Sequence, residues 1–201
     1  MRVIGLTGGI ACGKSTVSAR LAERGAVIVD GDRISRSLTA ADGPALPGIR
    51  TAFGDGVFHA DGSLDRKALG RRVFSDEAER RRLNGIMQPL ILAEIARETE
   101  AARTAGAAAC VLDMPLLFEE GLDRLCDETW CVWLPREIQL RRLTERDGFT
   151  AAEAEARIDS QLPTDEKAAR ADRVLDNSGS CGELMRLTDL AFDAALKGGT
   201  P

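Results

Sequence analysis

The chain has 201 residues, of which 44% are hydrophobic and 29% are charged. These proportions are ordinary for a globular domain, so they exclude collagen-like, low-complexity and wholly disordered chains. The formal net charge is −5, which argues against a nucleic-acid partner because such a protein needs a net basic face. No run of 18 apolar residues exists to suggest a membrane partner. The length favours a single domain over residues 1–201.

The cysteine pattern bears on metal binding and on the compartment. Five cysteines and one histidine, His59, are present, and no two cysteines form a C-x-x-C pair. A Cys/His zinc site therefore lacks its usual ligand spacing. Free thiols in a reducing cytosol are the simpler interpretation. The apolar stretch at the N-terminus is too short for a signal peptide, and we expect a cytoplasmic protein.

The first 30 residues alternate strand and helix signals. Residues 3–6 are a short apolar run that predicts a buried strand, and a helix follows from Lys14 and is closed by Gly25. Residues 26–29 are a second apolar run, ended by Asp30. This strand–loop–helix–strand order is typical of parallel α/β architecture.

The rest of the chain continues the alternation around two inserted segments. Residues 31–105 are mainly helical in pattern and include a long charged helix that Pro89 should kink or interrupt. Three further strands are expected at 110–113, 130–134 and 174–176. Five strands alternating with helices predict an α/β fold with a doubly wound five-stranded parallel sheet. The helical insert at 31–105 and the stretch 137–170 are expected to be subdomains on that one core.

The strongest motif is a phosphate-binding loop between the first strand and the first helix. Residues 8–15, Gly-Gly-Ile-Ala-Cys-Gly-Lys-Ser, fit G-x-x-x-x-G-K-[ST]. Glycines let the backbone wrap closely around phosphates, and the helix that starts near Lys14 adds its positive end. In such loops the lysine reaches the β- and γ-phosphates and the following hydroxyl, here of Ser15, binds Mg²⁺. The motif predicts binding of a nucleoside triphosphate.

Three carboxylates follow predicted strands, where parallel sheets place their ligands. Asp30 and Asp32 come after the second strand, and either is able to accept a proton from an attacking hydroxyl. The alternative for each is a helix cap. Asp113 ends the third strand and resembles the carboxylate that holds Mg²⁺ or its water in phosphate-loop proteins. A strand-end cap is the alternative there.

Two later segments add candidate ligands for the nucleotide. Arg142 and Arg146 share a helix face at i, i+4 spacing, and arginines that close over phosphates stabilise phosphoryl transfer. The alternative is a solvated basic face paired with glutamates. Asn177 and Gly179 lie in a turn after the last strand and are suited to border a purine, although the same residues also make a good turn.

Together these motifs resemble the dephospho-CoA kinase family, over about residues 2–190. The resemblance rests on the phosphate loop with its flanks and on four further groups of residues: Asp30-Gly31-Asp32-Arg33, the insert segment 62–69, the run Asp113-Met114-Pro115-Leu116-Leu117-Phe118-Glu119, and a set that extends from Gln139, Arg142, Arg146, Arg157, Gln161 and Lys167 to 177–179. The resemblance implies a phosphate-loop kinase fold in which 31–105 is a helical substrate insert and 137–170 is a lid.

The resemblance also implies a reaction. The enzyme would transfer the γ-phosphoryl group of ATP to the ribose 3′-hydroxyl of dephospho-CoA, the last step of coenzyme A synthesis. Dephospho-CoA and ATP would be its partners, with Mg²⁺, and the protein would be a monomer or a weak homo-oligomer. Asp32 is placed as the general base, and the expected catalytic residues are Asp32, Lys14, Arg142 and Arg146. The metal residues are Ser15 and, through water, Asp113. The nucleotide-binding residues are Gly8, Gly9, Ala11, Cys12, Gly13, Lys14, Ser15, Thr16, Asn177 and Gly179.

Two other functions remain open at this point. Another small phosphate-loop kinase acting on a nucleoside or nucleotide would share the core and the lid. A nucleotide-dependent switch is a different class, but the chain has no Asn-Lys-x-Asp guanine motif and its arginine-rich lid favours chemistry. The Asp30-x-Asp32 pair and the run that starts at Asp113 favour the dephospho-CoA kinase reading over both.

Three residues depart from the family pattern. Ala11 stands where glycine is common, so it would be strained if that position needs a positive φ. Cys12 stands where serine is usual. Its thiol is expected either to be activated by the helix N-terminus and Lys14 or to be buried as a small hydrophobe. Gln88 stands where the family often has histidine, and glutamine does not titrate.

Overall fold

In a computed structural model the chain forms two compact units, Met1–Val29 with Ala101–Pro201 and Asp30–Glu100. The structure describes residues 1–198, apart from the side chains of 74 and 75. The second unit covers nearly the same residues as the predicted insert at 31–105. The organisation of the chain as one kinase domain with an insert and a lid stays a prediction.

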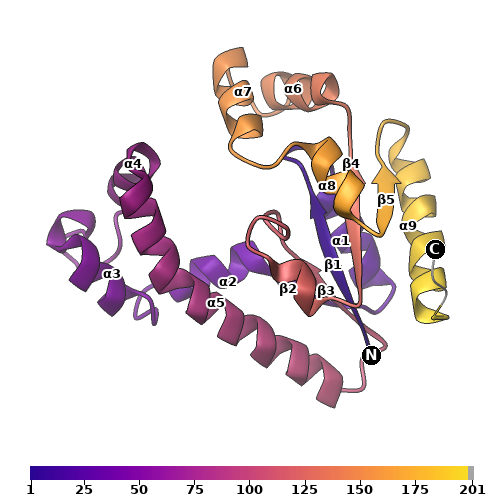
Figure 1. The fold of residues 1–201 in the computed structure, drawn as a ribbon, viewed down its shortest axis with the longest axis horizontal. Coiled ribbons are helices and arrows are strands. Elements are labelled where there is room, and N and C mark those ends of the chain that lie inside the picture. Colours follow the sequence, from indigo (N-terminus) through magenta and orange to yellow (C-terminus); the bar gives the residue numbers. More distant parts are fainter. Residues whose placement is uncertain (199–201) are drawn as a thin grey trace. The chain divides into compact units, whose positions relative to one another are not determined.

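The first unit is built on one sheet of five strands, which Figure 1 draws as arrows. Its strands, in sheet order, are β2 (Val27–Asp30), β3 (Ala109–Asp113), β1 (Arg2–Gly8), β4 (Glu128–Trp133) and β5 (Arg173–Asp176). The pairings of β1 with β3 and β4, and of β4 with β5, are parallel. The central place of β1 puts the loop that follows it in the middle of the sheet edge. The predicted five-stranded, doubly wound parallel α/β sheet is confirmed.

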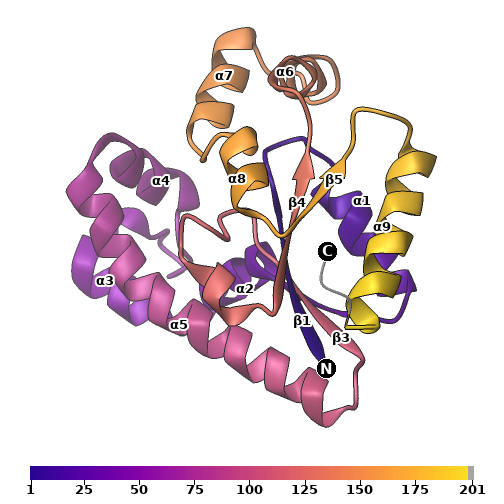
Figure 2. The same cartoon turned by 45° about the vertical axis from the view of Figure 1, so that its right-hand side comes forward.

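Helices cover this sheet and extend beyond its carboxyl edge. The helices α1 and α9 pack side by side against the sheet, and α8 packs against β1 and β4 (Figure 2). The helices α6 and α7 stand past the end of β4 and cover the first part of the predicted lid at 137–170. The bounds of these helices are α1 Lys14–Glu23, α6 Arg136–Glu145, α7 Ala151–Asp159, α8 Thr164–Arg170 and α9 Cys181–Leu196, with a short 3₁₀ helix at Leu122–Leu125.

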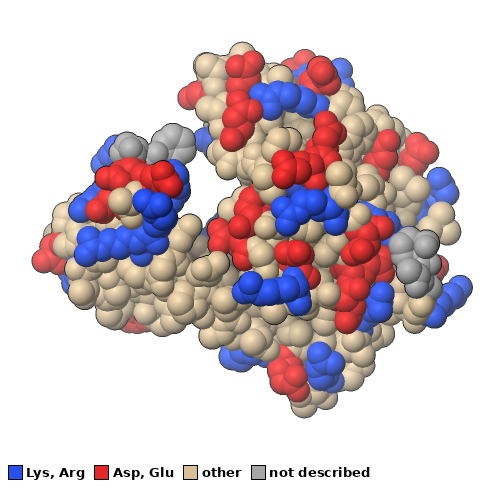
Figure 3. Space-filling model, in the orientation of Figure 1, with Lys and Arg blue, Asp and Glu red and all other residues tan. Residues whose placement is uncertain are grey.

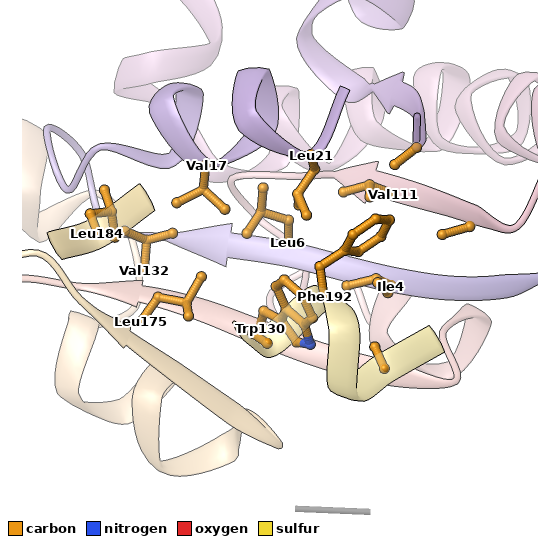
Figure 4. Close-up of a cluster of buried hydrophobic side chains, with 14 of the residues drawn as sticks. Ile4, Leu6, Val17, Leu21, Val111, Trp130, Val132, Leu175, Leu184 and Phe192 are labelled. Atoms are coloured by element: carbon orange, nitrogen blue, oxygen red, sulfur yellow. The ribbon is translucent and has the colours of Figure 1, made fainter. Parts of the chain in front are cut away.

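The main core lies between the sheet and the pair α1 and α9. Alternate residues of β1, Ile4 and Leu6, face it because strand side chains alternate between faces. Trp130 of β4 and Phe192 of α9 are also fully or almost fully buried there. Figure 4 shows these side chains and those of Val17 and Leu21 converging on β1. The cluster therefore anchors the first turns of α1, which directly follow the phosphate loop.

Gly25 ends α1 as predicted. Its φ of 89° lies in the left-handed region that glycine adopts without strain. The Gly25 N–H donates to the Ala22 carbonyl at 2.9 Å, and the Ala26 N–H donates to the Leu21 carbonyl at 3.0 Å. These two bonds satisfy the carbonyls of Ala22 and Leu21 in the last turn of the helix and lead the chain into β2.

The second unit is helical, as the sequence predicts. It contains α2 (Gly31–Leu38), α3 (Leu46–Phe53), a 3₁₀ turn at Asp55–Val57, α4 (Arg66–Ser75) and most of α5 (Glu77–Thr104). Of the two effects expected of Pro89, the interruption is wrong, because α5 continues through it, and the kink stays a prediction. Proline removes one N–H donor from the helix, and Pro89 itself is exposed.

The charged surface is mixed in sign. On the face drawn in Figure 3, blue lysine and arginine side chains alternate with red aspartate and glutamate side chains. This mixture agrees with the small net negative charge of the whole chain. Among the described helices, none is long and apolar enough to cross a membrane.

Candidate active site

The phosphate loop joins β1 to α1 and is closed by short backbone bonds. The Cys12 N–H donates to the Gly9 carbonyl at 3.1 Å, and the Thr16 N–H donates to the Gly13 carbonyl at 3.0 Å. Gly13 has φ 93° and ends the loop where α1 begins at Lys14. The first free N–H groups of α1 therefore lie at the loop, the arrangement that binds anions.

Lys14 and Asp113 form an ion pair across the neighbouring strands β1 and β3. Their side chains are 19% and 8% exposed, respectively. The ammonium group is thus held at the carboxyl edge of the sheet, beside the loop. The two residues that the sequence assigned to the γ-phosphate and to the metal are brought into contact.

The donors beside this pair suit a hard divalent cation. Ser15, in the first turn of α1, is exposed and offers a hydroxyl, and Asp113 offers a carboxylate. Magnesium prefers oxygen donors and commonly keeps waters and substrate phosphates as further ligands. No cluster of three or more His, Cys, Asp or Glu residues suited to a metal occurs among the described residues. This donor set fits a metal that arrives with a nucleotide.

Asn177 and Arg142 hold the loop from the side of β5 and α6. The Asn177 Nδ2 group donates to the Cys12 carbonyl at 2.7 Å. The Arg142 guanidinium donates to the Ala11 carbonyl at 3.1 Å and to the Asn177 carbonyl at 3.4 Å. A Cβ on Gly13 would come within 2.3 Å of Asn177 Nδ2, so Gly13 is needed here for close approach as well as for its φ. The amide predicted to border a purine supports the loop backbone, while Gly179 lies exposed beyond it.

Ala11 adopts a left-handed backbone conformation, which glycine takes up without strain. Its φ is 61°, a region that costs an L-residue roughly 1–2 kcal/mol. Its methyl group packs with Ile10 against Leu143 of α6 and Ile158 of α7. The strain anticipated from the sequence is present, and packing against α6 and α7 offsets part of it.

Cys12 is buried and not activated. Its side chain is fully inaccessible and belongs to the main core. Burial raises the pKa of the Cys12 thiol to about 11, although Thr164, Gly9, Arg142 and Lys167 act in the opposite direction. Of the two alternatives for this thiol, burial as a small hydrophobe therefore holds and the reactive thiolate is wrong. Removal from water disfavours the charged form more than the nearby positive charges favour it.

Two buried polar residues behind the loop were missed as supports by the sequence analysis. Gln139 donates through Nε2 to the Leu134 carbonyl at 2.8 Å and to the Thr164 hydroxyl at 3.0 Å. A Cβ on Gly9 would lie 2.1 Å from that hydroxyl. Gln139 and Thr164 are 2% and 8% exposed, and nothing in their sequence spacing signals this contact.

Arg142 lies within α6, whereas Arg146 lies just after its last residue, Glu145. Arg146 follows α6 and is exposed, and its guanidinium makes two bonds to the Asp147 carboxylate, at 2.8 and 2.9 Å. The hydrogen bonds to Asp147 raise the pKa of Arg146 above its ordinary value. The structure thus places Arg142 on the loop and Arg146 on a neighbouring carboxylate.

In the second unit, Asp30, the last residue of β2, and Asp32 are engaged differently. Asp30 caps α2, because its carboxylate accepts from the Arg33 N–H at 3.0 Å. Asp32 lies in the first turn of α2 and is exposed. Within the described part of the chain, no hydrogen bond or ion pair occupies its carboxylate. The cap alternative therefore holds for Asp30, and Asp32 keeps a carboxylate that is available to a ligand.

Comparisons with known proteins point to one family. A family model described as dephospho-CoA kinase matches residues 2–183. A dephospho-CoA kinase of Symbiobacterium thermophilum is 50% identical over 203 residues, which is 100% of this chain and 85% of that protein. One of Anaeromyxobacter dehalogenans is 49% identical and covers 99% of this chain and 94% of its own.

Solved structures agree with the fold. A crystal structure from Thermus thermophilus superposes with a TM-score of 0.82 at 33% identity, covering 96% of each chain. The dephospho-CoA kinase of Campylobacter jejuni superposes with a TM-score of 0.73 at 27% identity, covering 98% of each chain.

Proposed function

Because the chain belongs to the dephospho-CoA kinase family, we propose that it transfers the γ-phosphoryl group of ATP to the ribose 3′-hydroxyl of dephospho-CoA. The products are coenzyme A and ADP. The observation that carries the proposal is the family match over residues 2–183. It is supported by relatives of that name that align along nearly all of this chain.

The triphosphate is proposed to bind at the loop between β1 and α1. The free N–H groups at the start of α1 and the Lys14 ammonium would face its phosphate oxygens. Asn177 and Arg142 support this role indirectly, because they already hold the carbonyls of Cys12 and Ala11. A loop held in this way loses little further freedom when a nucleotide binds.

Mg²⁺ is proposed to be held by the Ser15 hydroxyl and, through water, by Asp113. When bound, the ion would neutralise charge on the phosphate oxygens during transfer. Asp113 keeps Lys14 at the carboxyl edge of the sheet in the structure. The same carboxylate is therefore positioned to exchange its ammonium partner for a metal-bound water.

Asp32 is proposed as the general base. It follows the carboxyl end of β2 by two residues and carries an exposed carboxylate. It would accept the proton of the ribose 3′-hydroxyl while that oxygen bonds to the γ-phosphorus and the bond to the bridging oxygen of ADP breaks. Asp30 is unsuited to the role because it caps α2.

The lid arginines are proposed to stabilise the negative charge of the transferring group. Arg142 lies at the loop already. Arg146 would have to leave Asp147 to reach a phosphate. We also propose a cytoplasmic location, which the free thiols of the five cysteines support.

An ADP-release assay with a panel of acceptors tests the proposed function. Dephospho-CoA should give the highest kcat/KM, and free adenosine should be much poorer because it lacks the remote groups whose binding energy positions the hydroxyl. Equal kcat/KM for adenosine and dephospho-CoA, or a preference for a nucleoside monophosphate, would replace this function with that of another small kinase.

A further inference from the structure

A buried lysine lies beside the candidate site and has no role in the proposed chemistry. Lys167, on α8, is fully inaccessible to solvent, which is rare for lysine. Its Nζ group donates to the Pro115 carbonyl at 2.6 Å and pairs with Glu119 Oε1 at 2.8 Å. Both partners belong to the segment that follows Asp113 at the end of β3.

The Pro115 carbonyl connects this lysine to the strand that carries the phosphate loop. The same oxygen accepts from the Thr7 hydroxyl at 3.1 Å, and Thr7 is the residue before Gly8. The neighbouring Met114 N–H donates to the Leu6 carbonyl at 2.9 Å. The turn immediately after Asp113 is thus held to β1 on one side and to α8 on the other.

The Glu119 carboxylate connects the lysine to the lid. Oε1 also accepts from the Leu162 N–H at 3.0 Å. Residues 160–163 join α7 to α8, so this bond lies where the chain returns from the lid helices to the sheet. One buried ammonium therefore holds both the turn after Asp113 and, through Glu119, the return of the lid.

We infer that Lys167 is a positioning residue, which acts through Pro115 and Glu119 to hold Asp113 opposite the phosphate loop. This inference rests on the proposed function for the role of Asp113. A purely stabilising role explains the Lys167–Glu119 ion pair poorly. The free-energy cost of removing two charges from water is about as large as the gain from their attraction. Placement of a metal-binding carboxylate is sensitive, since an error of about 1 Å can cost about 100-fold in rate.

The test replaces the ammonium with an apolar group of similar length. Lys167→Met should lower kcat by about 10- to 100-fold, the usual effect of losing a group that orients a metal-binding residue. It should also reduce the increase in Tm produced by Mg·ATP, a measurement that needs no acceptor. Lys197→Met removes an exposed lysine at the end of α9 and should leave both values unchanged.

Two further variants keep the test decisive if Lys167→Met does not fold. The double variant Lys167→Met/Glu119→Gln removes the unpaired carboxylate and keeps an acceptor for Leu162. It should fold and show the same losses. Glu119→Gln alone keeps an acceptor for both donors and should lower kcat by several-fold. Wild-type kcat and a wild-type Mg·ATP shift in the folded variants would overturn the inference.

Failure of the proposed function would give a different result from failure of the inference about Lys167. The wild-type protein would then bind Mg·ATP without phosphorylating dephospho-CoA. A smaller Mg·ATP shift in the Lys167 variants would still support the positioning role, because that shift reports only on the nucleotide side.

Discussion

The phosphate loop and the turn that carries Asp32 differ in how far the protein itself occupies their polar groups. At the loop, Lys14 pairs with Asp113, Arg142 donates to Ala11 and Asn177 donates to Cys12. In the turn, Asp30 caps α2 while the Asp32 carboxylate is exposed and has no partner within the described residues. The proposed donor side is held by internal contacts, whereas the proposed acceptor residue, Asp32, has a carboxylate that no described side chain occupies.

This difference has a physical reason. Phosphate oxygens are held best by donors fixed before the ligand arrives, because preorganised dipoles need no rearrangement during the reaction. A general base must instead meet a hydroxyl that only the substrate brings. We therefore expect substitutions at the loop to affect nucleotide binding and turnover together, and a substitution at Asp32 to affect mainly turnover.

Asp32→Asn tests the acceptor side and should have the largest effect. The amide keeps the shape of the side chain but does not take the hydroxyl proton, so kcat should fall by about 10²–10⁴-fold. Affinity for ATP should change little. Asp30→Asn is the matched control, since its amide oxygen still accepts from Arg33 and kcat should remain near wild type. Steady-state ADP release measures kcat for both variants. If Asp30→Asn is inactive while Asp32→Asn has normal turnover, Asp30 and not Asp32 is the general base.

Lys14→Met tests the donor side. Loss of one fixed cation at the transferring group should lower kcat by about 10²–10³-fold. It also leaves the Asp113 carboxylate, 8% exposed, without its partner, so Tm should fall as well. Circular dichroism would establish that the variant is folded. A folded variant with normal turnover would contradict the role of the loop in the mechanism.

Alkylation of the cysteines tests whether the side chain of Cys12 in the phosphate loop is buried, as the structure shows. Iodoacetamide at pH 8 should modify Cys181, which is exposed, and leave Cys12, Cys110 and Cys131, which are buried. Peptide mapping before and after unfolding would identify the sites. Cys181 is the internal control, and modification of Cys12 in the native protein without nucleotide would contradict its burial.

The buried thiol also predicts a pH dependence. The folded-state pKa of Cys12 is raised from 9.0 to about 11, so above pH 9 the unfolded chain releases a proton that the folded chain retains. The contribution of the Cys12 thiol to the free energy of unfolding is therefore fully present below pH 9 and is lost as the pH rises toward 11. Urea unfolding of wild type and Cys12→Ala across this range should show a shallower loss in the variant.

Ala11→Gly should have the smallest effect. Relief of the positive φ returns roughly 1–2 kcal/mol, but the lost methyl burial costs about 0.8 kcal/mol and the added freedom of glycine about 0.5–1 kcal/mol. The free energy of unfolding should therefore change by less than about 1 kcal/mol in urea titrations. Ala11→Val is the contrasting variant, because a β-branched residue at φ 61° should be clearly destabilising. A large gain from Ala11→Gly would show that packing against the lid contributes little.

Local signals in the sequence were sufficient to predict the first three strands and the end of the first helix. The apolar runs at 3–6, 26–29 and 110–113 predict strands that the structure contains as β1, β2 and β3. Gly25 ends α1 as its turn chemistry predicts. These features depend on neighbours within a few residues, so the order of residues alone specifies them. Pro89 is the exception, because α5 continues through it although its local signal predicts a break or a kink.

The sequence by itself determined the phosphate-loop motif, the alternation of strands and helices and the family. The tertiary structure decided which polar side chains those elements bury. Asn177 and Cys12 are 165 positions apart, and Lys167 and Pro115 are 52 apart. No local pattern distinguishes a buried lysine or a buried thiol from an exposed one, because burial is set by distant segments that fold over it. Cys12 is therefore buried, Asn177 supports the loop, and Lys167 holds the segment after β3, through contacts that exist only in the folded protein.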